Sequence, residues 1–389
     1  MSELTEARWS ETKSALLEGL KGNRKSVMDV TLENTRKYIN ESASVGSTSA
    51  GNVATLNRVI LPVIRRVMPT VIANELVGVQ PMTGPVGQIH TLRVRYAEAS
   101  AGTTTTTAGE EALSPFKIAE AYSGDNSSTK AGSTSALEGT GGKKLSIQIL
   151  KQTVEAKSRK LSANWTFEAA QDAQSQQGID IEAEIMAALA QEITAEIDQE
   201  IIGSLYSLAG TGIELYDQQA VSGTATFVGD EHAALAILIN RAANAIAQRT
   251  RRGAGNYAVV SPTALTILQS ATTSAFARST EGTFEAPTNN KLVGTLNSAM
   301  KVYVNTYAAN DDVLVGYKGS SEADAPAFYC PYIPLMSSGV VLNPSTFEPT
   351  VSFLTRYGYV ELSNTASSLG NAADYLAKVA VTTANLSFA

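Results

Sequence analysis

The chain has 389 residues, 43% of them hydrophobic, and its 37 acidic residues outnumber its 30 basic ones to give a net charge of −7. This acidic balance argues against a protein dedicated to binding DNA or an anionic membrane. A single cysteine, Cys330, excludes an internal disulfide framework, and the two histidines, His90 and His232, leave little for metal binding or histidine catalysis.

Residues 1–50 form a charged N-terminal arm, with seven acidic and seven basic residues and no signal-peptide pattern. Ser42–Ala50 is a small-residue linker at its end, and an ordinary disordered terminus fits the same composition. We expect a cytosolic, reducing compartment and no association with a membrane, because no apolar run in the chain is long enough to span a bilayer. Residues 51–96 begin the packed region, and Gln88–Tyr96 alternates like a strand.

Residues 97–144 are unusual because 31 of the 48 are Ser, Thr, Gly or Ala. Such a segment buries too little apolar surface to offset the entropy lost on ordering it. A loop of this length is either disordered or functional, so an ordered loop needs contacts from outside itself.

A strand over Leu145–Leu161 precedes the clearest helix, from Asp180 to about Leu208, with Asp180 as its N-cap and Gly210 as its stop. Seven apolar residues recur every four positions along this helix. Each four-residue step turns about 400°, so the apolar stripe winds by about 240° over six steps and must meet several partners in turn. The stripe consists of Ile181, Ile185, Leu189, Ile193, Ile197, Ile201 and Leu205.

Charge is distributed unevenly around this helix. Residues 161–240 contain 13 acidic residues and no Lys or Arg, whereas residues 51–97 carry five arginines and one acid. Either the acids face water, or they meet basic groups from elsewhere in the fold or from another chain. The candidate inter-subunit basic residues are Arg58, Arg65, Arg66, Arg93 and Arg95.

Residues 211–330 resemble an α/β unit. Glu231–Thr250 is an amphipathic helix, Tyr257–Val260 a strand, and Ser261-Pro262 the start of another helix. Lys301–Tyr307 and Val313–Tyr317 are further strands, and Thr350–Tyr359 and Leu376–Val381 return to a β pattern.

The search for catalytic motifs finds nothing that predicts an enzyme, a cofactor or a metal site. The segment EGTGGKK over Glu138–Lys144 fails the phosphate-loop spacing, because Leu137 stands at the first glycine position and Lys144 at the Ser/Thr position. No G-x-S-x-G elbow is present. What remains is an arm, an over-long loop and a helix whose apolar stripe faces several directions. In a lattice of identical subunits, each extension could lie across a neighbouring subunit and gain the contacts it lacks.

Three segments, in order along the chain, resemble the major capsid proteins of T4-type contractile-tailed bacteriophages. The first is LPVIRRVMPTVIANELVGVQPMTGPVGQIHTLRVRY, Leu61–Tyr96. The second is Val154–Gln199, which includes VEAKSRKLSANWTFEAAQDAQSQQGIDIEAEI. The third combines AFYCPYIPL, Ala327–Leu335, with FEPTVSFLTRYGYV, Phe347–Val360.

The resemblance implies an α+β chain with the HK97-type fold. Residues 1–50 would be the N-terminal arm, 51–96 the start of the peripheral region, and 97–150 the E-loop region, which reaches over a neighbouring subunit. Residues 151–210 would hold the peripheral domain with its spine helix, 211–345 the axial α/β domain, and 346–389 strands that return to both sheets. The chain is too short for the insertion subdomain that larger members carry.

By the same resemblance, the subunit assembles with itself in hexamers and pentamers, in the cytoplasm of a bacterial host, into the icosahedral or prolate shell of a virion. The shell encloses double-stranded DNA without reading its sequence. Scaffold, portal, head-maturation protease and decoration proteins are the further expected partners.

The resemblance also implies removal of a propeptide after a glutamate in an [Ile/Leu]-x-Glu pattern. Ile39-Asn40-Glu41, followed by Ser42, fits at the boundary between arm and linker, so the expected propeptide ends at residue 41. The same pattern occurs at Leu16–Glu18 and Ile118–Glu120.

If the long helix lines the inner wall of a shell, its acids would repel packaged DNA over roughly 8–10 Å, about one Debye length. These candidate acids are Glu182, Glu184, Glu192, Glu196, Asp198 and Glu200. Two other functions compete with the phage shell: an encapsulin-like cargo compartment with the same fold, and a soluble hydrolase. DNA inside purified particles would distinguish a phage shell from an encapsulin-like compartment. Monodisperse small oligomers would favour the hydrolase.

Overall fold

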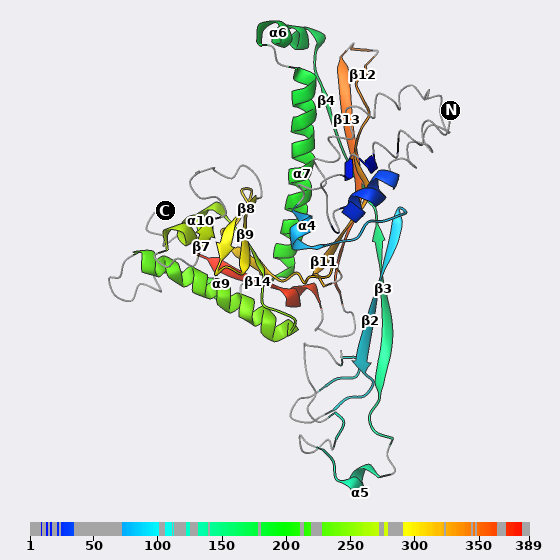
Figure 1. Ribbon diagram of the computed structural model, residues 1–389, viewed down its shortest axis with the longest axis vertical. Coiled ribbons are helices and arrows are strands. Elements are labelled where there is room, and N and C mark those ends of the chain that lie inside the picture. The colour runs from blue at the N-terminus through cyan, green and yellow to red at the C-terminus, as the bar shows by residue number, and fades with distance from the viewer. Residues whose placement is uncertain are drawn as a thin grey trace.

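The computed structural model contains two β-sheets, a long helix between them and a projecting two-stranded ribbon (Figure 1). Helices and strands are mixed along the chain, so the predicted α+β class is confirmed. The described residues are 9, 13–14, 16–17, 22, 25–34, 72–100, 106–110, 112, 122–124, 131–138, 141–177, 180–210, 214–218, 228–271, 276–278, 291–322, 324–343, 345–346, 348–363 and 371–382.

The first sheet combines strands from distant parts of the sequence. Its order is β1–β11–β13–β12, with β4 also paired to β13. β11 and β13 are antiparallel, and their inward faces are almost wholly buried. The strands are β1 (Gly78–Val79), β4 (Lys157–Asn164), β11 (Ala327–Ser337), β12 (Val341–Leu342) and β13 (Pro349–Glu361).

The second sheet has seven strands in the order β5–β14–β10–β6–β9–β8–β7. Helices α9 (Val228–Thr250) and α10 (Pro262–Ser270) pack on it, and Ser261 caps α10 by accepting a hydrogen bond from the Ala264 amide. The strands are β5 (Glu214–Tyr216), β6 (Tyr257–Val260), β7 (Phe276–Arg278), β8 (Lys291–Leu296), β9 (Met300–Val304), β10 (Val313–Gly316) and β14 (Leu376–Val381).

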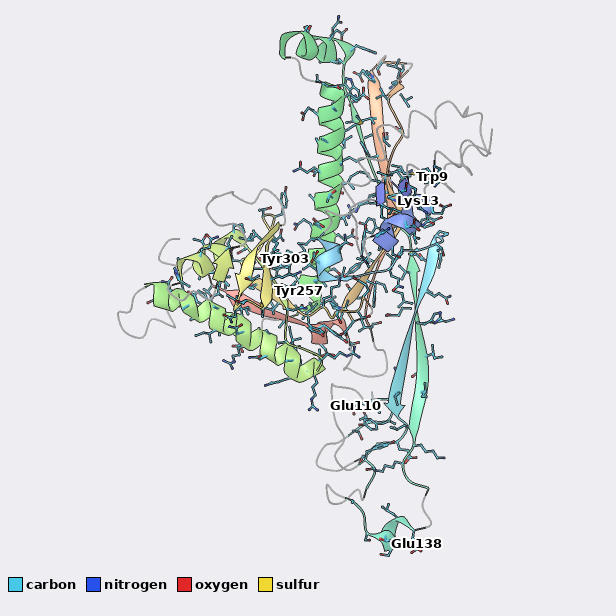
Figure 2. All side chains as sticks on the ribbon, in the orientation of Figure 1. Trp9, Lys13, Glu110, Glu138, Tyr257 and Tyr303 are labelled. Atoms are coloured by element: carbon cyan, nitrogen blue, oxygen red, sulfur yellow. The ribbon has the colours of Figure 1, made fainter. Side chains whose placement is uncertain are left out.

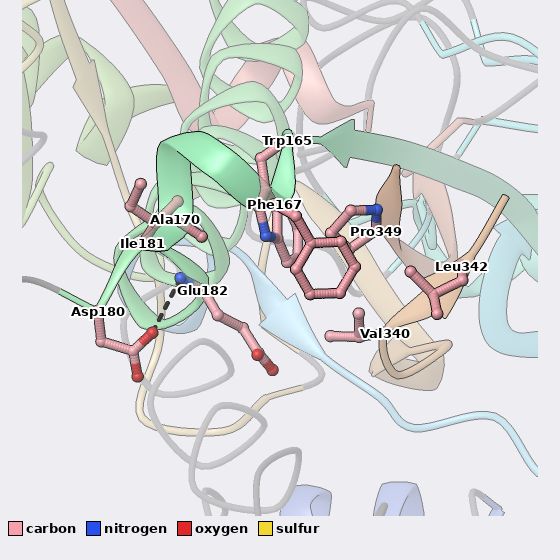
Figure 3. Close-up of a pocket in the computed structure, with 9 residues that line it drawn as sticks. All are labelled: Trp165, Phe167, Ala170, Asp180, Ile181, Glu182, Val340, Leu342 and Pro349. Carbon is pink, nitrogen blue, oxygen red and sulfur yellow. Dashed lines mark hydrogen bonds between the residues drawn. The ribbon is translucent and has the colours of Figure 1, made fainter. Parts of the chain in front are cut away.

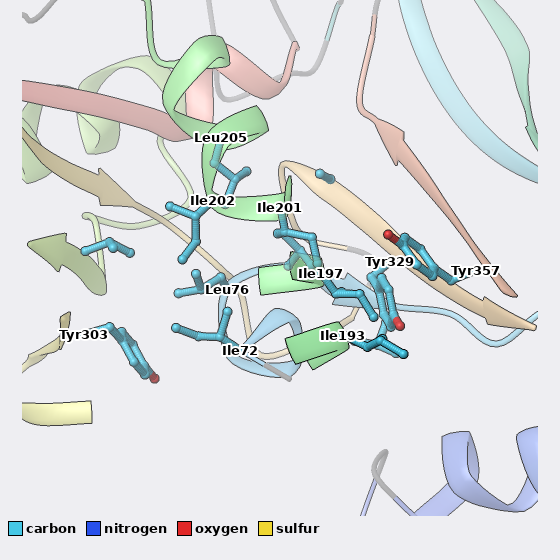
Figure 4. Packing of buried hydrophobic residues seen from close by; sticks show 14 of the residues in the cluster. Ile72, Leu76, Ile193, Ile197, Ile201, Ile202, Leu205, Tyr303, Tyr329 and Tyr357 are labelled. Atoms are coloured by element: carbon cyan, nitrogen blue, oxygen red, sulfur yellow. The ribbon is translucent and has the colours of Figure 1, made fainter. Parts of the chain in front are cut away.

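Helix α7 (Ile181–Leu208) joins the two sheets through one apolar core. Asp180 caps its start by accepting from the Glu182 amide, and Gly210, with φ of +67°, follows its end, as predicted. The C-terminal half contacts residues of both sheets, so the winding stripe does meet several partners (Figure 4). Core members include Ile72, Leu76, Ile193, Ile197, Ile201, Leu205, Tyr257, Tyr303, Tyr329, Phe353 and Tyr357.

The second sheet is buried on both faces. Along β6, Tyr257 and Val259 point into the core shared with α7, while Ala258 and Val260 point into a second core with α9 and α10. Since successive strand residues face opposite ways, this explains why Tyr257–Val260 is apolar throughout. The short helix η1 (Ala372–Tyr375) leads directly into β14.

The ribbon consists of β2 (Val86–Tyr96) and β3 (Leu145–Glu155), which pair along their whole length. It projects away from both sheets, and α5 (Thr134–Leu137) lies beyond its far end (Figure 1). The predicted single strand over Leu145–Leu161 is therefore wrong in one respect: it breaks at Ala156, whose amide donates to the Pro85 carbonyl, and continues as β4 in the first sheet.

Part of the N-terminal arm packs on the body of the subunit instead of standing apart from it. Helical residues 25–34 bury Val27 and Leu32, and the Asn34 Nδ2 donates to the carbonyl oxygens of Met82 and Tyr332 at 2.7 and 2.9 Å. Lys13 holds this helix through its Nζ, 2.8 Å from Asp29 Oδ1. Because Asn34 reaches both the segment after β1 and strand β11, the arm is not wholly detached.

One sequence-based boundary also differs from the structure. β11 and β12 fall within the expected axial segment 211–345 but belong to the first sheet, because β11 pairs with β1 and β13. Within the loop 97–144, Tyr122 packs on Tyr96 at the end of the ribbon and donates from its hydroxyl to the Lys144 carbonyl, whereas α5 lies beyond that end. Figure 2 places Glu110 near the end of the ribbon and Glu138 far beyond it.

Candidate assembly surfaces

The exposed acids of α7 lie mainly along its N-terminal half. Glu182, Glu184 and Glu192 are exposed, and the first two stand in the first helical turn, where the helix dipole favours negative charge. They remain candidates for an acidic face.

Asp198 does not belong to this face, contrary to the sequence-based assignment. Its side chain is buried at 5% exposure, and its Oδ1 accepts a hydrogen bond from the Ile72 amide at 2.9 Å. The amide lies just before helix α4 (Ala73–Leu76), where the chain enters the packed body. Sequence alone could not separate Asp198 from the exposed acids, because the partner is a backbone group 126 residues away.

Glu196 and Glu200 are held by an arginine that the sequence did not single out. Arg159 on β4 places Nη1 2.6 Å from Glu196 Oε2 and Nη2 2.6 Å from Glu200 Oε2, and its Nε donates to the Tyr357 hydroxyl. The Tyr357 hydroxyl in turn donates to Glu200. The cluster of Arg159, Glu196, Glu200 and Tyr357 therefore fastens α7 to both β4 and β13.

The cluster shifts the pKa values of its members. Burial alone would raise the pKa of the Glu200 carboxyl, but the hydrogen bonds from Tyr357 and Arg159 outweigh it and lower that pKa below its usual value. Burial alone would likewise lower the pKa of Arg159, and its bonds to Glu200 and Tyr357 raise it instead. Both shifts favour the charged pair.

The structure describes the side chain of only one member of the predicted basic set, Arg95. Arg58, Arg65 and Arg66 lie outside the described residues, as does the side chain of Arg93. Arg95 is buried on β2, in the ribbon, and not on α7. The candidate processing residues Ile39, Glu41 and Ser42 also lie outside the described part of the chain.

One face of the ribbon exposes a row of apolar side chains. Ile147 and Ile149 are 71% and 66% exposed, and Leu145 beside them is also exposed. Ile147 pairs with Val94 across the ribbon, but Val94 is partly buried against Tyr96 and Tyr122, so the exposed row runs along β3. We call Leu145, Ile147 and Ile149 the ribbon face.

A second apolar surface lies at the far end of the molecule, where α6 (Phe167–Gln177) meets the start of α7 and strand β12 (Figures 1 and 3). A hollow of about 370 Å³ opens there, with Asp180 and Glu182 on its rim. Val340 and Leu342 line it and are substantially exposed. We call Trp165, Phe167, Ile181, Val340, Leu342 and Pro349 the tip groove.

The remaining motifs carry no catalytic arrangement among the described residues. His232 is buried, and its Nδ1 lies 2.5 Å from Ser270 Oγ, while burial lowers its pKa. Cys330 is buried, and burial raises the pKa of its thiol to about 12, so it is not a reactive thiolate. Lys143 of the glycine-rich segment donates to Ser100 Oγ and lies over the Tyr122 ring.

Within the described part of the chain, no three His, Cys, Asp or Glu side chains cluster in a way that could hold a metal ion. None of the helices described there combines the length and the apolar character needed to cross a bilayer.

Comparison with known proteins identifies the chain's relatives. A family model described as "Major capsid protein Gp23" matches residues 53–381. The chain belongs to this family. It is 30% identical to the major capsid protein of Vibrio phage KVP40, covering 85% of this chain and 82% of that protein. It is 27% identical to the major capsid protein of Enterobacteria phage T4, covering 82% and 78% respectively.

Among solved structures, the capsid of Myoviridae Phage XM1 is similar at 10% identity and a TM-score of 0.46, over 80% of this chain and 92% of that chain. The resemblance to T4-type major capsid proteins drawn from the sequence is confirmed by the family match. The surfaces described above are therefore those of a Gp23-family major capsid subunit.

Replacing Arg159 with Met should lower the free energy of unfolding by about 1 kcal/mol at pH 7, because two half-exposed carboxylates lose their partner. Since the folded-state pKa of Glu200 is lowered, the contribution is fully present above the pKa of an unfolded glutamate, about 4.3, and is lost as the pH falls through the lower folded-state pKa. Urea unfolding followed by circular dichroism at neutral and at acidic pH measures it.

Lys160→Met is the matched control, because Lys160 is exposed on the opposite face of the same strand. Its effect should stay within about 0.5 kcal/mol at either pH. Equal destabilisation by both substitutions would show that the cluster does not fasten the helix.

Proposed function

We propose that the chain is the structural, non-enzymatic subunit that self-assembles in hexamers and pentamers into the head shell of a tailed bacteriophage. The shell, icosahedral or prolate, assembles in the cytoplasm of a bacterial host and encloses the double-stranded DNA genome of the virion. Membership of the major capsid protein family supports this function. The structural observation that carries it is the ribbon face.

An isolated two-stranded ribbon is marginally stable in water and needs a packing partner on one face. The ribbon has eleven residues in each strand, about 37 Å of extended chain, and exposes its apolar row in the single subunit. An apolar patch of this kind marks a protein–protein contact. A second copy of the chain, laid alongside, would cover it and repeat the contact around a shell.

Replacing both Ile147 and Ile149 with Glu should abolish particle formation while leaving the subunit folded, because both side chains are exposed in the single subunit and the proposed contact would bury the new charges. Electron microscopy of the purified chain counts particles, and circular dichroism checks the fold. The control is Gln148→Glu, one residue away on the other face of the ribbon. Normal particles from the double variant would contradict the proposal.

The exposed acids of α7 support a second part of the proposal, a non-adhesive inner wall. Residues 161–240 hold no basic side chain, and Glu184 and Glu192 are exposed on the helix. Each charge acts over only about one Debye length, roughly 8 Å, so the effect arises from many copies around the shell.

Changing Glu184 and Glu192 together to Lys should slow DNA ejection from filled heads, since the wall then attracts phosphate. Changing the same pair to Gln should give an intermediate rate, which separates loss of repulsion from gain of attraction. Ejection followed by a DNA-binding dye measures all three. Identical ejection rates for the unsubstituted chain and for the Gln and Lys double variants would show that this face of α7 lies away from the DNA.

The N-terminal arm is proposed to be a propeptide that a head-maturation protease removes after Glu41. Helical residues 25–34 are held on the body by burial and by Asn34. A cut at Glu41 would remove their covalent tie to the body and leave only these contacts. Scaffold, portal and decoration proteins are the other proposed partners of the shell.

Mass spectrometry of mature heads should therefore find a chain that starts at Ser42. Glu41→Ala should keep the arm attached. Glu18→Ala, which alters another match to the pattern within the arm, should not change the mature N-terminus. A mature chain starting at Met1 would contradict processing, and one starting at Gly19 would move the cut to Glu18.

A further inference from the structure

Arg251 adopts a strained backbone conformation at the end of helix α9. Its φ is +51°, in the left-handed region that residues other than glycine rarely adopt, and its amide donates to the Ala247 carbonyl at 2.7 Å. Glycine is the usual residue at this position after a helix, because it has no Cβ to strain the turn. The side chain of Arg251 is exposed and bonds to no other described residue. A strained residue without a reason inside its own subunit indicates a role in a contact outside it.

Gly203 raises the same question in the interior of helix α7. Glycine destabilises a helix interior relative to alanine, because it loses more backbone freedom on folding. A Cβ at position 203 would have no described atom within 4 Å apart from the nearby backbone of its own helix. Packing within the described subunit therefore does not require glycine here, and the open space lets a group from outside approach the helix closely.

A hollow of about 360 Å³ opens beside Gly203, between α7 and the loop that follows β9. Ser207 of α7 lines it, together with Tyr307 and Asn310 of the loop. Tyr307 is 55% exposed, so part of its ring is open to an incoming group, and a guanidinium stacks well on such a ring. The hollow has room for one long side chain, and its side-chain oxygens can accept hydrogen bonds from it.

The charges around the hollow favour a cation. Lys378 is the only basic residue among the described ones that line it, and Asp312 Oδ2, 2.8 Å from its Nζ, neutralises it. Asp311, which follows Asn310 of the lining, is partly exposed and has no side-chain partner among the described residues. Helix α7 ends beside the hollow, and no basic residue in its last turn offsets the negative end of the helix dipole. A guanidinium matches this arrangement, because it can stack on Tyr307 while donating to amide and carboxylate oxygens.

Arg251 and the hollow lie on opposite faces and at opposite edges of the second sheet. Helix α9 packs on one face of the sheet, and α7 packs on the other. Arg251 precedes the amino end of β6, whereas the hollow lies beyond the carboxyl end of β9, the parallel neighbour of β6. The four residues of β6 alone separate these edges by about 13 Å, so the guanidinium cannot enter the hollow of its own subunit. A second copy can present its arginine head to tail, and contacts of this kind close into rings.

We propose that the hollow beside Gly203 is a guanidinium-binding site and that it takes Arg251 of a second copy. The guanidinium stacks on the Tyr307 ring and donates to the side-chain oxygens of Asn310 and Asp311. This contact rests on the proposed shell function and names one pair of surfaces that meets in it. It accounts for both local costs, because glycine at position 203 leaves room for the incoming side chain, and an arginine instead of a glycine follows α9.

Two substitutions should stabilise the unassembled full-length chain and yet weaken its assembly, a combination that a purely structural role does not produce. Arg251→Gly relieves the strained turn, and Gly203→Leu restores a good helix former while filling the hollow. Each should raise the midpoint of thermal unfolding followed by circular dichroism. Each should also raise, by about tenfold, the lowest concentration at which electron microscopy finds particles, because a charge-assisted contact is lost. Gly203→Ala is the matched control: it gains the helix propensity and leaves the hollow open, so this concentration should change by less than about twofold.

Thiol cross-linking identifies the partner surface, because the chain's one native cysteine, Cys330, is only 2% exposed. Full-length chains with Arg251→Cys and with Ser207→Cys are assembled alone or mixed, and treated with a bifunctional thiol reagent about as long as an arginine side chain. A cross-linked dimer should form in the mixture and in neither variant alone. Asn244→Cys mixed with Ser207→Cys is the matched control and should give no dimer, because Asn244 is exposed on the same helix, about 10 Å before Arg251.

Each outcome decides the matter. Unchanged assembly of both Arg251→Gly and Gly203→Leu, or a loss of subunit stability in both, overturns the proposal, and so does the absence of a dimer from the mixture. A dimer with Arg251→Cys alone or with Ser207→Cys alone would show like surfaces meeting and also overturns it. All of these results leave the shell function intact, whereas failure of the unsubstituted chain to form particles would overturn the shell function instead.

Discussion

The fold depends on the apolar stripe of helix α7, which is shared by both sheets. Because apolar residues recur every four positions, the stripe winds around the helix, and its C-terminal half meets strands of the first and second sheets in one core. A straight stripe would face one direction only, and one of the two sheets would lose its contact with the helix. The N-terminal half of α7 extends past the second sheet and, with α6 and β12 of the first sheet, creates the tip at the end of the molecule.

The ribbon and the tip, at opposite ends of the subunit, consequently keep apolar side chains exposed to solvent. The ribbon extends away at one end because the chain enters the first sheet only after Ala156, as β4, while β3 before it pairs with β2. Val154 packs closely on Gly358 of β13, and this contact holds the base of the ribbon against the first sheet. A Cβ added at position 358 would lie 2.4 Å from Val154 Cγ1, so only glycine leaves room for the contact. A ribbon that is packed at its base and exposes an apolar face is suited to binding another subunit.

The acidic residues of α7 fall into two groups: some form ion pairs within the subunit, and others are exposed at its surface. Arg159 neutralises two of the thirteen acids in the stretch without basic residues and ties the helix to β4 and β13, whereas the acids nearer the tip face outward. Exposed ion pairs of this kind contribute little individually.

Sequence by itself determined the elements with strong local signals and the family. Asp180, Gly210 and Ser261-Pro262 mark helix ends through caps and backbone preferences that act within a few residues, and they are where the sequence predicts them. Only tertiary structure decided the partner of Asp198, the role of Arg159, the docking of residues 25–34 and the sheet that β11 joins. Each of these depends on groups tens to hundreds of residues apart, whose approach no local pattern encodes.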